Sequence, residues 1–220
     1  MSATIALRPA HRIAVWALVV ATVLWLAVEL AWPGGPIGAL DRWWASLGPP
    51  RSEAAIALAR LLDVVGGVVV SVAIRVAVAS WLWLRRRTGD LWLWLGSVVA
   101  AEAVSLAAKY LYDRPRPPGS LVETVTASFP SGHTTNAAAM SIAAVVVFTR
   151  PGTLGRRVGI VLAISYTAAM GWSRTYLQAH WLGDVIGGAL IGTTAVLAVA
   201  AVSGSGIRAA TDTSRGRPHP

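Results

Sequence analysis

Six apolar runs constrain this chain more than any other feature of its sequence. A transmembrane helix needs about 20 mostly apolar residues, and the first run, from Ile13 to Trp32, has that length. The runs cover residues 13–32, 61–84, 91–112, 134–149, 158–172 and 181–202, with the fourth and fifth shorter than the others. Short polar segments separate them. We therefore predict an all-α integral membrane bundle of six transmembrane helices.

The composition agrees with a membrane protein. Of 220 residues, 55% are hydrophobic and only 13% are charged, and the mean hydropathy of +0.59 is too high for a soluble domain. Residues 1–202 are predicted to form one domain, followed by a disordered cytoplasmic tail over residues 203–220, which is rich in glycine, serine and arginine. Residues 37–60 alternate polar and apolar side chains, which predicts a loop with a short interfacial helix.

The basic residues indicate how the chain is oriented. Six spans place both termini on one side, together with 11 arginines: Arg8, Arg12, Arg85, Arg86, Arg87, Arg150, Arg156, Arg157, Arg208, Arg215 and Arg217. The other side has seven basic residues: Arg42, Arg51, Arg60, Lys109, Arg114, Arg116 and Arg174. By the positive-inside rule the first side is cytoplasmic, so we predict a multi-pass plasma membrane protein. The net charge is +9, but the basic residues form no basic stripe or reader motif, so nucleic acid is not an expected partner.

Three polar clusters fall at the ends of these runs. They are Lys109–Pro117, Phe129–His133 and Ser173–Asp184. Counting spans places all three at the outer membrane face, where we expect them to form one pocket. The sequence has no cysteine, which excludes disulfides and thiol chemistry.

The predicted pocket suits a phosphate group. Lys109, Arg116 and Arg174 supply three cations, and a helix starting at Ser131-Gly132 supplies unpaired backbone N–H groups at the positive end of its dipole. Such groups stabilise a phosphoryl group in transfer without a metal. No carboxylate cluster that would hold a metal accompanies them, so neither a metal nor another cofactor is expected.

Two histidines and one aspartate complete the predicted chemistry. His180 and Asp184 are four residues apart at a helix start, so the carboxylate is expected to fix the imidazole tautomer. We predict that His180 attacks phosphorus and forms a phosphohistidine that water hydrolyses. His133 is then the general acid for the leaving oxygen. His11 and His219 lie in terminal segments and receive no role.

The spacing of these residues resembles a known family. Lys109-x6-Arg116-Pro117, Pro130-Ser131-Gly132-His133 and Ser173-Arg174-x5-His180-x3-Asp184 are similar to the three signature motifs of the type 2 phosphatidic acid phosphatase superfamily, and all 11 specified positions match. That superfamily also includes vanadium haloperoxidases and glucose-6-phosphatases. The resemblance implies a metal-independent membrane enzyme that dephosphorylates lipid phosphates or pyrophosphates.

The resemblance also implies residue roles. Lys109, Arg116 and Arg174 become phosphate ligands, helped by Ser131 and Gly132. His133 becomes the acid, His180 the nucleophile and Asp184 its orienting partner. Two Arg-Pro pairs are present, and the spacing from Lys109 selects Arg116, leaving Arg114 as a predicted rim residue.

Several substrates and two other functions stay open at this stage. Polyprenyl pyrophosphate is favoured, followed by phosphatidic acid or phosphatidylglycerol phosphate, which present similar chemistry. A lipid-phosphate binder or transporter would retain the pocket without needing both histidines and Asp184. A vanadate-dependent peroxidase would share the residues, but such enzymes are typically soluble and larger. No oligomeric state is predicted.

Charged residues inside the apolar runs are costly unless paired. Arg75 and Glu102 lie at about the same depth on adjacent predicted spans, at ~1.5 Å of rise per residue, so we predict an ion pair between them. Glu29 and Asp63 lie near the outer ends of their runs and are predicted to be interfacial. Asp113 and Glu123 are predicted to be rim residues.

Overall fold

The computed structural model of the protein describes residues 9–31, 35–48 and 52–203. Within these residues the chain is all-helical and contains no strand. Its helices are α1 (Pro9–Ala31), α2 (Pro36–Ser46), α3 (Glu53–Gly66), α4 (Val68–Leu84), α5 (Thr88–Leu111), α6 (Gly132–Phe148), α7 (Leu154–Tyr176) and α8 (Leu182–Ser203). The predicted tail beyond Ser203 lies outside the described residues.

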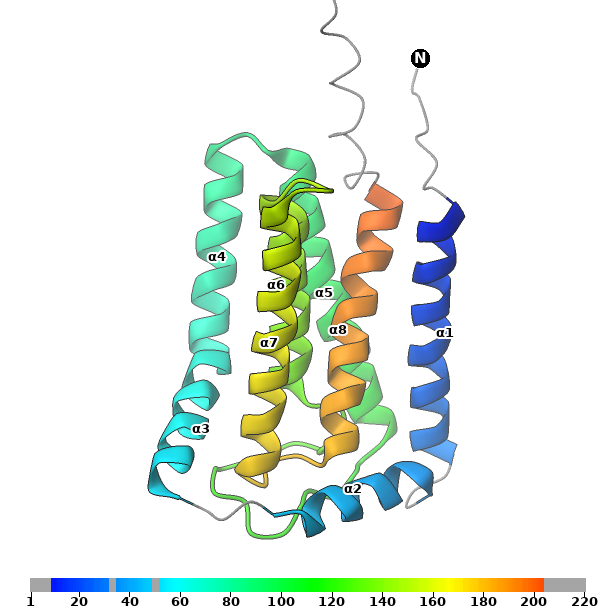
Figure 1. Cartoon of the computed structure of the whole chain (residues 1–220), viewed down its shortest axis with the longest axis vertical. Coiled ribbons are helices and arrows are strands. Elements are labelled where there is room, and N and C mark those ends of the chain that lie inside the picture. Colours follow the sequence, from blue (N-terminus) through cyan, green and yellow to red (C-terminus); the bar gives the residue numbers. More distant parts are fainter. Residues whose placement is uncertain (1–8, 32–34, 49–51, 204–220) are drawn as a thin grey trace, which may run out of the picture.

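The long helices run roughly parallel, and α2 lies across one end of the bundle (Figure 1). Helix α6 packs against α5, α7 and α8, while α1 packs against α8 and α3 against α7. The start of α1, the end of α8 and the α4–α5 connection lie at one end, and α2 with the α5–α6 connection lies at the other (Figure 1). This arrangement places the ends of several helices around a common region beside α2.

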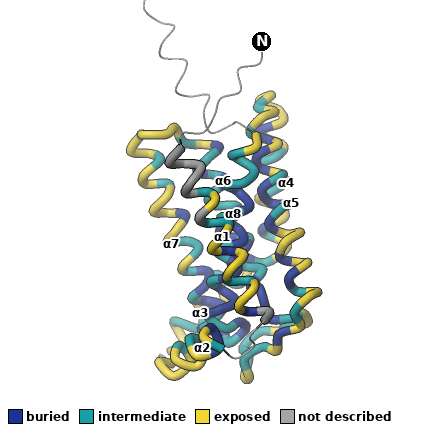
Figure 2. The backbone as a smooth tube through the Cα atoms, turned by 90° about the vertical axis from the view of Figure 1, so that its right-hand side faces the viewer, coloured by how far each residue is buried: buried dark blue, intermediate teal, exposed yellow. Residues whose placement is uncertain are grey.

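The outer surface of the bundle is strongly apolar. Large side chains there include Val69, 82% exposed, and Leu84, 77% exposed, whereas Leu93 and Val196 are fully buried between helices. Figure 2 shows exposed stretches along the outer faces of α4 and α7 and buried residues toward the middle of the bundle. A broad exposed apolar surface of this kind marks a membrane contact, which fits a membrane protein.

The described helices support part of the predicted span count. Helices α5 and α8 are long and apolar enough to cross a membrane, and α3 with α4 would make a third span if the bent pair is counted as one. The prediction of a loop over residues 37–60 is wrong in its second half, since residues 53–60 belong to α3. The fifth predicted helix is also longer than expected, because α7 extends from Leu154 to Tyr176.

The bend between α3 and α4 was not predicted. The two helices meet at 47°, and Gly67 between them is extended, with φ −65° and ψ 162°. Two adjacent glycines weaken a helix because each has a low helical propensity. The hydroxyl of Ser71 donates to the Gly66 carbonyl at 3.1 Å and so satisfies one backbone acceptor at the break.

Helix α8 packs closely against the start of α6 at Gly188 and Gly192. A Cβ on Gly188 would lie 2.7 Å from the Ser131 carbonyl oxygen, and one on Gly192 would lie 2.4 Å from the Thr135 carbonyl oxygen. Both contacts are with the backbone of α6. The glycines therefore let α8 approach α6 at the end where the polar clusters meet.

Gly192→Ala is expected to destabilise the protein by about 1–3 kcal/mol, since its methyl group would overlap a backbone oxygen that has little room to move. Gly89→Ala is the matched control, because a Cβ at Gly89 meets nothing within 4 Å. Both changes replace a helical glycine with alanine, so a comparison of thermal unfolding in one detergent tests the packing effect. An unchanged melting temperature for Gly192→Ala would contradict this packing.

The predicted ion pair between Arg75 and Glu102 is confirmed. Arg75 on α4 donates through Nη1 to Oε1 of Glu102 on α5 at 2.5 Å. The indole N–H of Trp94 donates to the Arg75 carbonyl oxygen at 3.3 Å. These contacts join the adjacent helices α4 and α5.

Candidate active site

The three polar clusters meet at the α2 end of the bundle, as predicted. Arg116 in the α5–α6 connection donates to the Ala179 carbonyl at 2.6 Å, which joins the first cluster to the third. The Ser131 N–H donates to the Asp184 carbonyl at 3.0 Å, which joins the second cluster to the third. These backbone contacts hold the start of α6 beside the start of α8.

The first turn of α6 is arranged to receive an anion. Ser131 is its fully buried N-cap residue, and within the described part of the chain its side chain makes no capping hydrogen bond. The Ser131 hydroxyl accepts a hydrogen bond from Thr134 at 3.1 Å, so its own proton is available to donate elsewhere. Gly132 and His133 follow as the first two helical residues, where backbone N–H groups have no acceptor within the helix.

His180 lies differently from the prediction, in the turn before α8 rather than on the helix. Its Nδ1 is nevertheless 3.4 Å from Oδ2 of Asp184, longer than a good hydrogen bond but within reach of a charge interaction. Its Nε2 lies 3.3 Å from Nη1 of Arg116. Because a guanidinium only donates, this contact favours the tautomer with the proton on Nδ1 and the lone pair on Nε2.

Burial lowers the pKa of His180 from 6.5 to about 4. The Asp184 carboxylate opposes this shift, while the charges of Arg116 and Arg174 add to it. The imidazole is therefore neutral near pH 7 and carries a lone pair that can act as a nucleophile.

We expect the ring nitrogens of His180 to keep the neutral pattern until the pH falls well below 6.5, because the folded protein disfavours its charged form. The measurement is a pH titration of ¹⁵N-histidine-labelled protein in micelles. The sequence has only four histidines, so His180→Gln assigns the signal by its disappearance. Titration of that signal near pH 6.5 would contradict the effect of burial.

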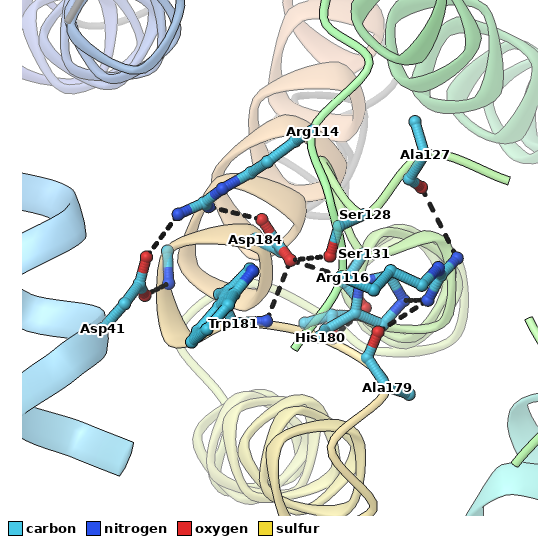
Figure 3. Close-up of polar contacts among 12 residues, drawn as sticks. Asp41, Arg114, Arg116, Ala127, Ser128, Ser131, Ala179, His180, Trp181 and Asp184 are labelled. Atoms are coloured by element: carbon cyan, nitrogen blue, oxygen red, sulfur yellow. Dashed lines mark hydrogen bonds and ion pairs between the residues drawn. The ribbon is translucent and has the colours of Figure 1, made fainter. Parts of the chain in front are cut away.

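Asp184 is held by hydrogen bonds at both of its carboxylate oxygens. Its Oδ2 accepts the Trp181 N–H at 2.9 Å and the Ser128 hydroxyl, while its Oδ1 accepts Arg114 Nη1 at 2.6 Å. Figure 3 shows Asp184 between Arg114 on one side and Ser128, Trp181 and His180 on the other. The bond from Trp181 is the half of a capping box in which the third helical residue returns to the N-cap. Because this bond makes Trp181 the N-cap residue of α8, His180 lies before the helix.

The prediction of Arg114 as a rim residue is wrong. Arg114 is 8% exposed, and its guanidinium contacts Glu29, Asp41 and Asp184. Glu29 was predicted to be interfacial but is only 3% exposed. Asp113, by contrast, is exposed in the loop beside Arg114, and Glu123 is exposed further along it.

In the structure, the side chains of the three predicted phosphate ligands donate hydrogen bonds to oxygens of the protein itself. Lys109 Nζ donates to the Ala127 carbonyl at 2.6 Å, and Arg116 Nη2 approaches the same oxygen at 3.4 Å, so these cations converge. Arg174 donates through Nη1 to Asp63. Its side chain is 3% exposed, and its Nε is buried with no hydrogen-bond partner among the described residues. Such an unpaired buried donor is costly unless a ligand accepts from it.

Burial lowers the pKa of Arg116, and the nearby charge of Arg174 adds to the effect. The two guanidinium groups therefore lie close enough to repel each other. An anion between them would relieve that repulsion, which is the electrostatic requirement for a phosphate site.

Sequence reasoning missed Asp63, which was predicted to be interfacial. Its Oδ1 lies 3.1 Å from Nε2 of His133 and also accepts from Arg174. The Asp63 carbonyl oxygen lies 3.2 Å from the same His133 nitrogen. Gly66 permits this approach, because a Cβ there would lie 2.9 Å from His133 Cδ2. The only available signal was a charged residue just inside an apolar run.

A cavity of about 240 Å³ reaches His180 from the side of α2. Its lining includes Asp41, Trp44, Pro117, Tyr176 and Trp181. Among the described residues, no group of three or more histidine, cysteine and acidic side chains is placed to hold a metal ion. The site itself supplies cationic, imidazole and carboxylate groups.

The helical bundle has cations, two histidines and an open helix start together at one end, an arrangement that suits a phosphate group. A family model described as the PAP2 superfamily matches residues 90–205, more than half of the chain. The chain belongs to the PAP2 superfamily. No curated protein matches the sequence significantly.

Two solved structures share the fold. The first is a transmembrane PAP2 type phosphatidylglycerolphosphate phosphatase from Bacillus subtilis, with a TM-score of 0.75 and 21% identity over 88% of this chain and 98% of that one. The second is LpxE from Aquifex aeolicus, with a TM-score of 0.57 and 20% identity over 73% of this chain and 92% of that one. Because the first match covers 88% of this chain, the structural similarity extends beyond the residues of the family match.

Proposed function

We propose that the protein hydrolyses a lipid phosphate or pyrophosphate without a metal, through a phosphohistidine on His180. The observation that carries this proposal is the pair of contacts on one buried imidazole, with Asp184 at Nδ1 and Arg116 at Nε2. Anion binding alone has no need of an oriented, neutral imidazole. A nucleophile facing a phosphate ligand needs both.

The reaction divides into two displacements at phosphorus. His180 Nε2 attacks, the N–P bond forms and the P–O bond to the lipid breaks, while His133 gives its proton to the leaving oxygen. Water then attacks the phosphohistidine, His133 takes the proton from that water, and phosphate leaves as the N–P bond breaks. Lys109, Arg116 and Arg174, with Ser131 and the Gly132 N–H, stabilise the transferred group in both steps.

A lipid substrate is supported by a second cavity of about 350 Å³ between α4, α6 and α7. Its lining includes Ile74, Val78, Ala137 and Met140, together with Gly66, which lies against His133. An apolar chain placed there would leave its phosphate at the start of α6. We rank polyprenyl pyrophosphate first, followed by phosphatidic acid and phosphatidylglycerol phosphate, the last being the kind of lipid named for the Bacillus subtilis structure.

The test is phosphate release by detergent-purified protein with a chelator present. The panel is polyprenyl pyrophosphate, phosphatidic acid and phosphatidylglycerol phosphate, with His180→Gln as the inactive control. Release from at least one lipid that persists in chelator supports the proposal and identifies the substrate class. Loss of all release on adding chelator, or no release from any lipid by folded protein, would reject it.

We also propose six spans in the plasma membrane, with α2 in the interface, both termini cytoplasmic and the site outside. The arginine distribution supports this orientation. Because the chain has no cysteine, single substitutions report sidedness cleanly. An impermeant thiol reagent applied to intact cells should label Val125→Cys, near the site, and spare Arg150→Cys, in the α6–α7 turn. The reverse labelling would show that the protein has the opposite orientation in the membrane.

Two other functions make different predictions. A lipid-phosphate binder would bind the panel lipids without releasing phosphate. A vanadate-dependent peroxidase would oxidise halide when vanadate and peroxide are added. Halide oxidation without phosphatase activity would favour the second function over the proposed one.

A further inference from the structure

One arginine at a position that the first family motif leaves unspecified lies at the centre of a buried network of charges. Arg114 contacts carboxylates from three helices: Nη1 lies 2.8 Å from Oε1 of Glu29 on α1 and 2.6 Å from Oδ1 of Asp184 on α8, and Nη2 contacts Oδ2 of Asp41 on α2. All four side chains are less than a tenth exposed. Figure 3 shows Arg114 reaching Asp41 and Asp184.

Asp41 is bound at both of its oxygens. Oδ2 takes the contact from Arg114, and Oδ1 accepts the N–H of Gly183 at 2.7 Å. Gly183 lies in the first turn of α8, where backbone N–H groups have no helical acceptor. The carboxylate of one helix therefore caps another, and α2 is joined to the turn that carries Asp184.

The two oxygens of Asp184 have separate partners. Arg114 occupies Oδ1, whereas Oδ2 receives Trp181 and Ser128 and faces His180. A carboxylate held at both oxygens has a fixed plane. The Arg114 contact thus determines which edge of Asp184 is turned toward the imidazole.

We propose that Arg114, held by Asp41 and Glu29, is a positioning residue that orients Asp184 toward His180 and so makes α2 part of the catalytic apparatus. This inference rests on the proposed function of His180. Arg114 touches neither His180 nor the three proposed phosphate ligands through any hydrogen bond or ion pair found in the described residues. It acts through Asp184.

The network needs a guanidinium in particular. Its fixed fork reaches carboxylates in different directions from one planar group, which a single ammonium cannot reproduce. Burial raises the pKa of Asp41, while the Gly183 N–H and the charge of Arg114 act against that rise. Three acidic groups around one arginine also mean that Arg114 has no surplus charge to offer a phosphate.

A double-mutant cycle separates this role from a general structural one. Arg114→Lys and Arg114→Gln are made in the wild type and in Asp184→Asn, with the exposed Arg42→Lys on α2 as the matched control. We expect Arg114→Lys to lower kcat by about 10- to 100-fold, the scale for a misplaced catalytic group, with KM changed by less than about twofold. In the Asp184→Asn background, the same substitutions of Arg114 should lower kcat by less than about a further threefold, because the two residues act as a unit. Equal losses in both backgrounds would overturn the proposal.

A second measurement keeps the proposal testable if a variant is inactive for other reasons. In ¹⁵N-histidine spectra, Arg114→Lys should shift the His180 ring nitrogens away from the wild-type tautomer, while Arg42→Lys leaves them unchanged. Asp41→Asn, which retains an oxygen for Gly183, should move the same signals in the same direction. Unmoved signals in folded Arg114→Lys would overturn the positioning role. If the wild type releases no phosphate but the His180 signals still shift in Arg114→Lys, the phosphatase proposal alone would be rejected.

Discussion

His180→Gln is expected to lose turnover by at least about 10⁴-fold, because removing a nucleophile eliminates the covalent route rather than slowing it. Glutamine roughly preserves the volume of a side chain that is 4% exposed, so the packing around it should survive. With ³²P-labelled substrate, the wild type should accumulate acid-labile, alkali-stable label on the protein. His180→Gln should carry none.

His133→Gln is the informative companion variant. It should still form the labelled intermediate from a substrate whose leaving group needs no proton, since His133 serves the leaving oxygen. Near-normal hydrolysis by His180→Gln, or label retained in that variant, would remove His180 from its proposed role. Label lost equally in both variants with every leaving group would mean that the two histidines act together in binding.

Asp184→Asn is expected to lower kcat by about 10³- to 10⁴-fold, as in enzymes where an aspartate sets a histidine tautomer. An amide N–H₂ facing Nδ1 would donate to it and drive the ring proton to Nε2, the atom that must attack. The fully buried Asp184 also binds Trp181, so thermal unfolding is measured beside the rate. The exposed Asp113→Asn in the neighbouring loop is the control. A loss below about tenfold in folded protein would contradict tautomer control.

Much of the fold was predictable because its signals are local. Apolar runs and the polar segments between them placed most helices within a few residues, and the count of spans placed the three polar clusters at one end. The six-residue spacing from Lys109 selected Arg116, and that is the arginine that meets Nε2 of His180. These inferences use distances along the chain, which the sequence states directly.

The missed features depend on residues that are far apart in sequence. Arg114 meets Glu29 and Asp41 only because α1 and α2 pack beside α8, and Asp63 meets Arg174 only because α3 packs beside α7. No periodicity or spacing encodes those meetings. Before the packing was known, each of these charged residues was indistinguishable from an ordinary interfacial one.

The glycine contact between α6 and α8 has a consequence for the spacing of the two histidines. His133 follows the start of α6, and His180 precedes α8, where Gly188 lies against Ser131 and Thr135. The nearest atoms to the Cβ positions of Gly188 and Gly192 are the main-chain oxygens of Ser131 and Thr135, so the two main chains lie close together there. The spacing between the two helix starts that carry the histidines therefore depends on close packing of main chain, which has less freedom to adjust than packing between long side chains.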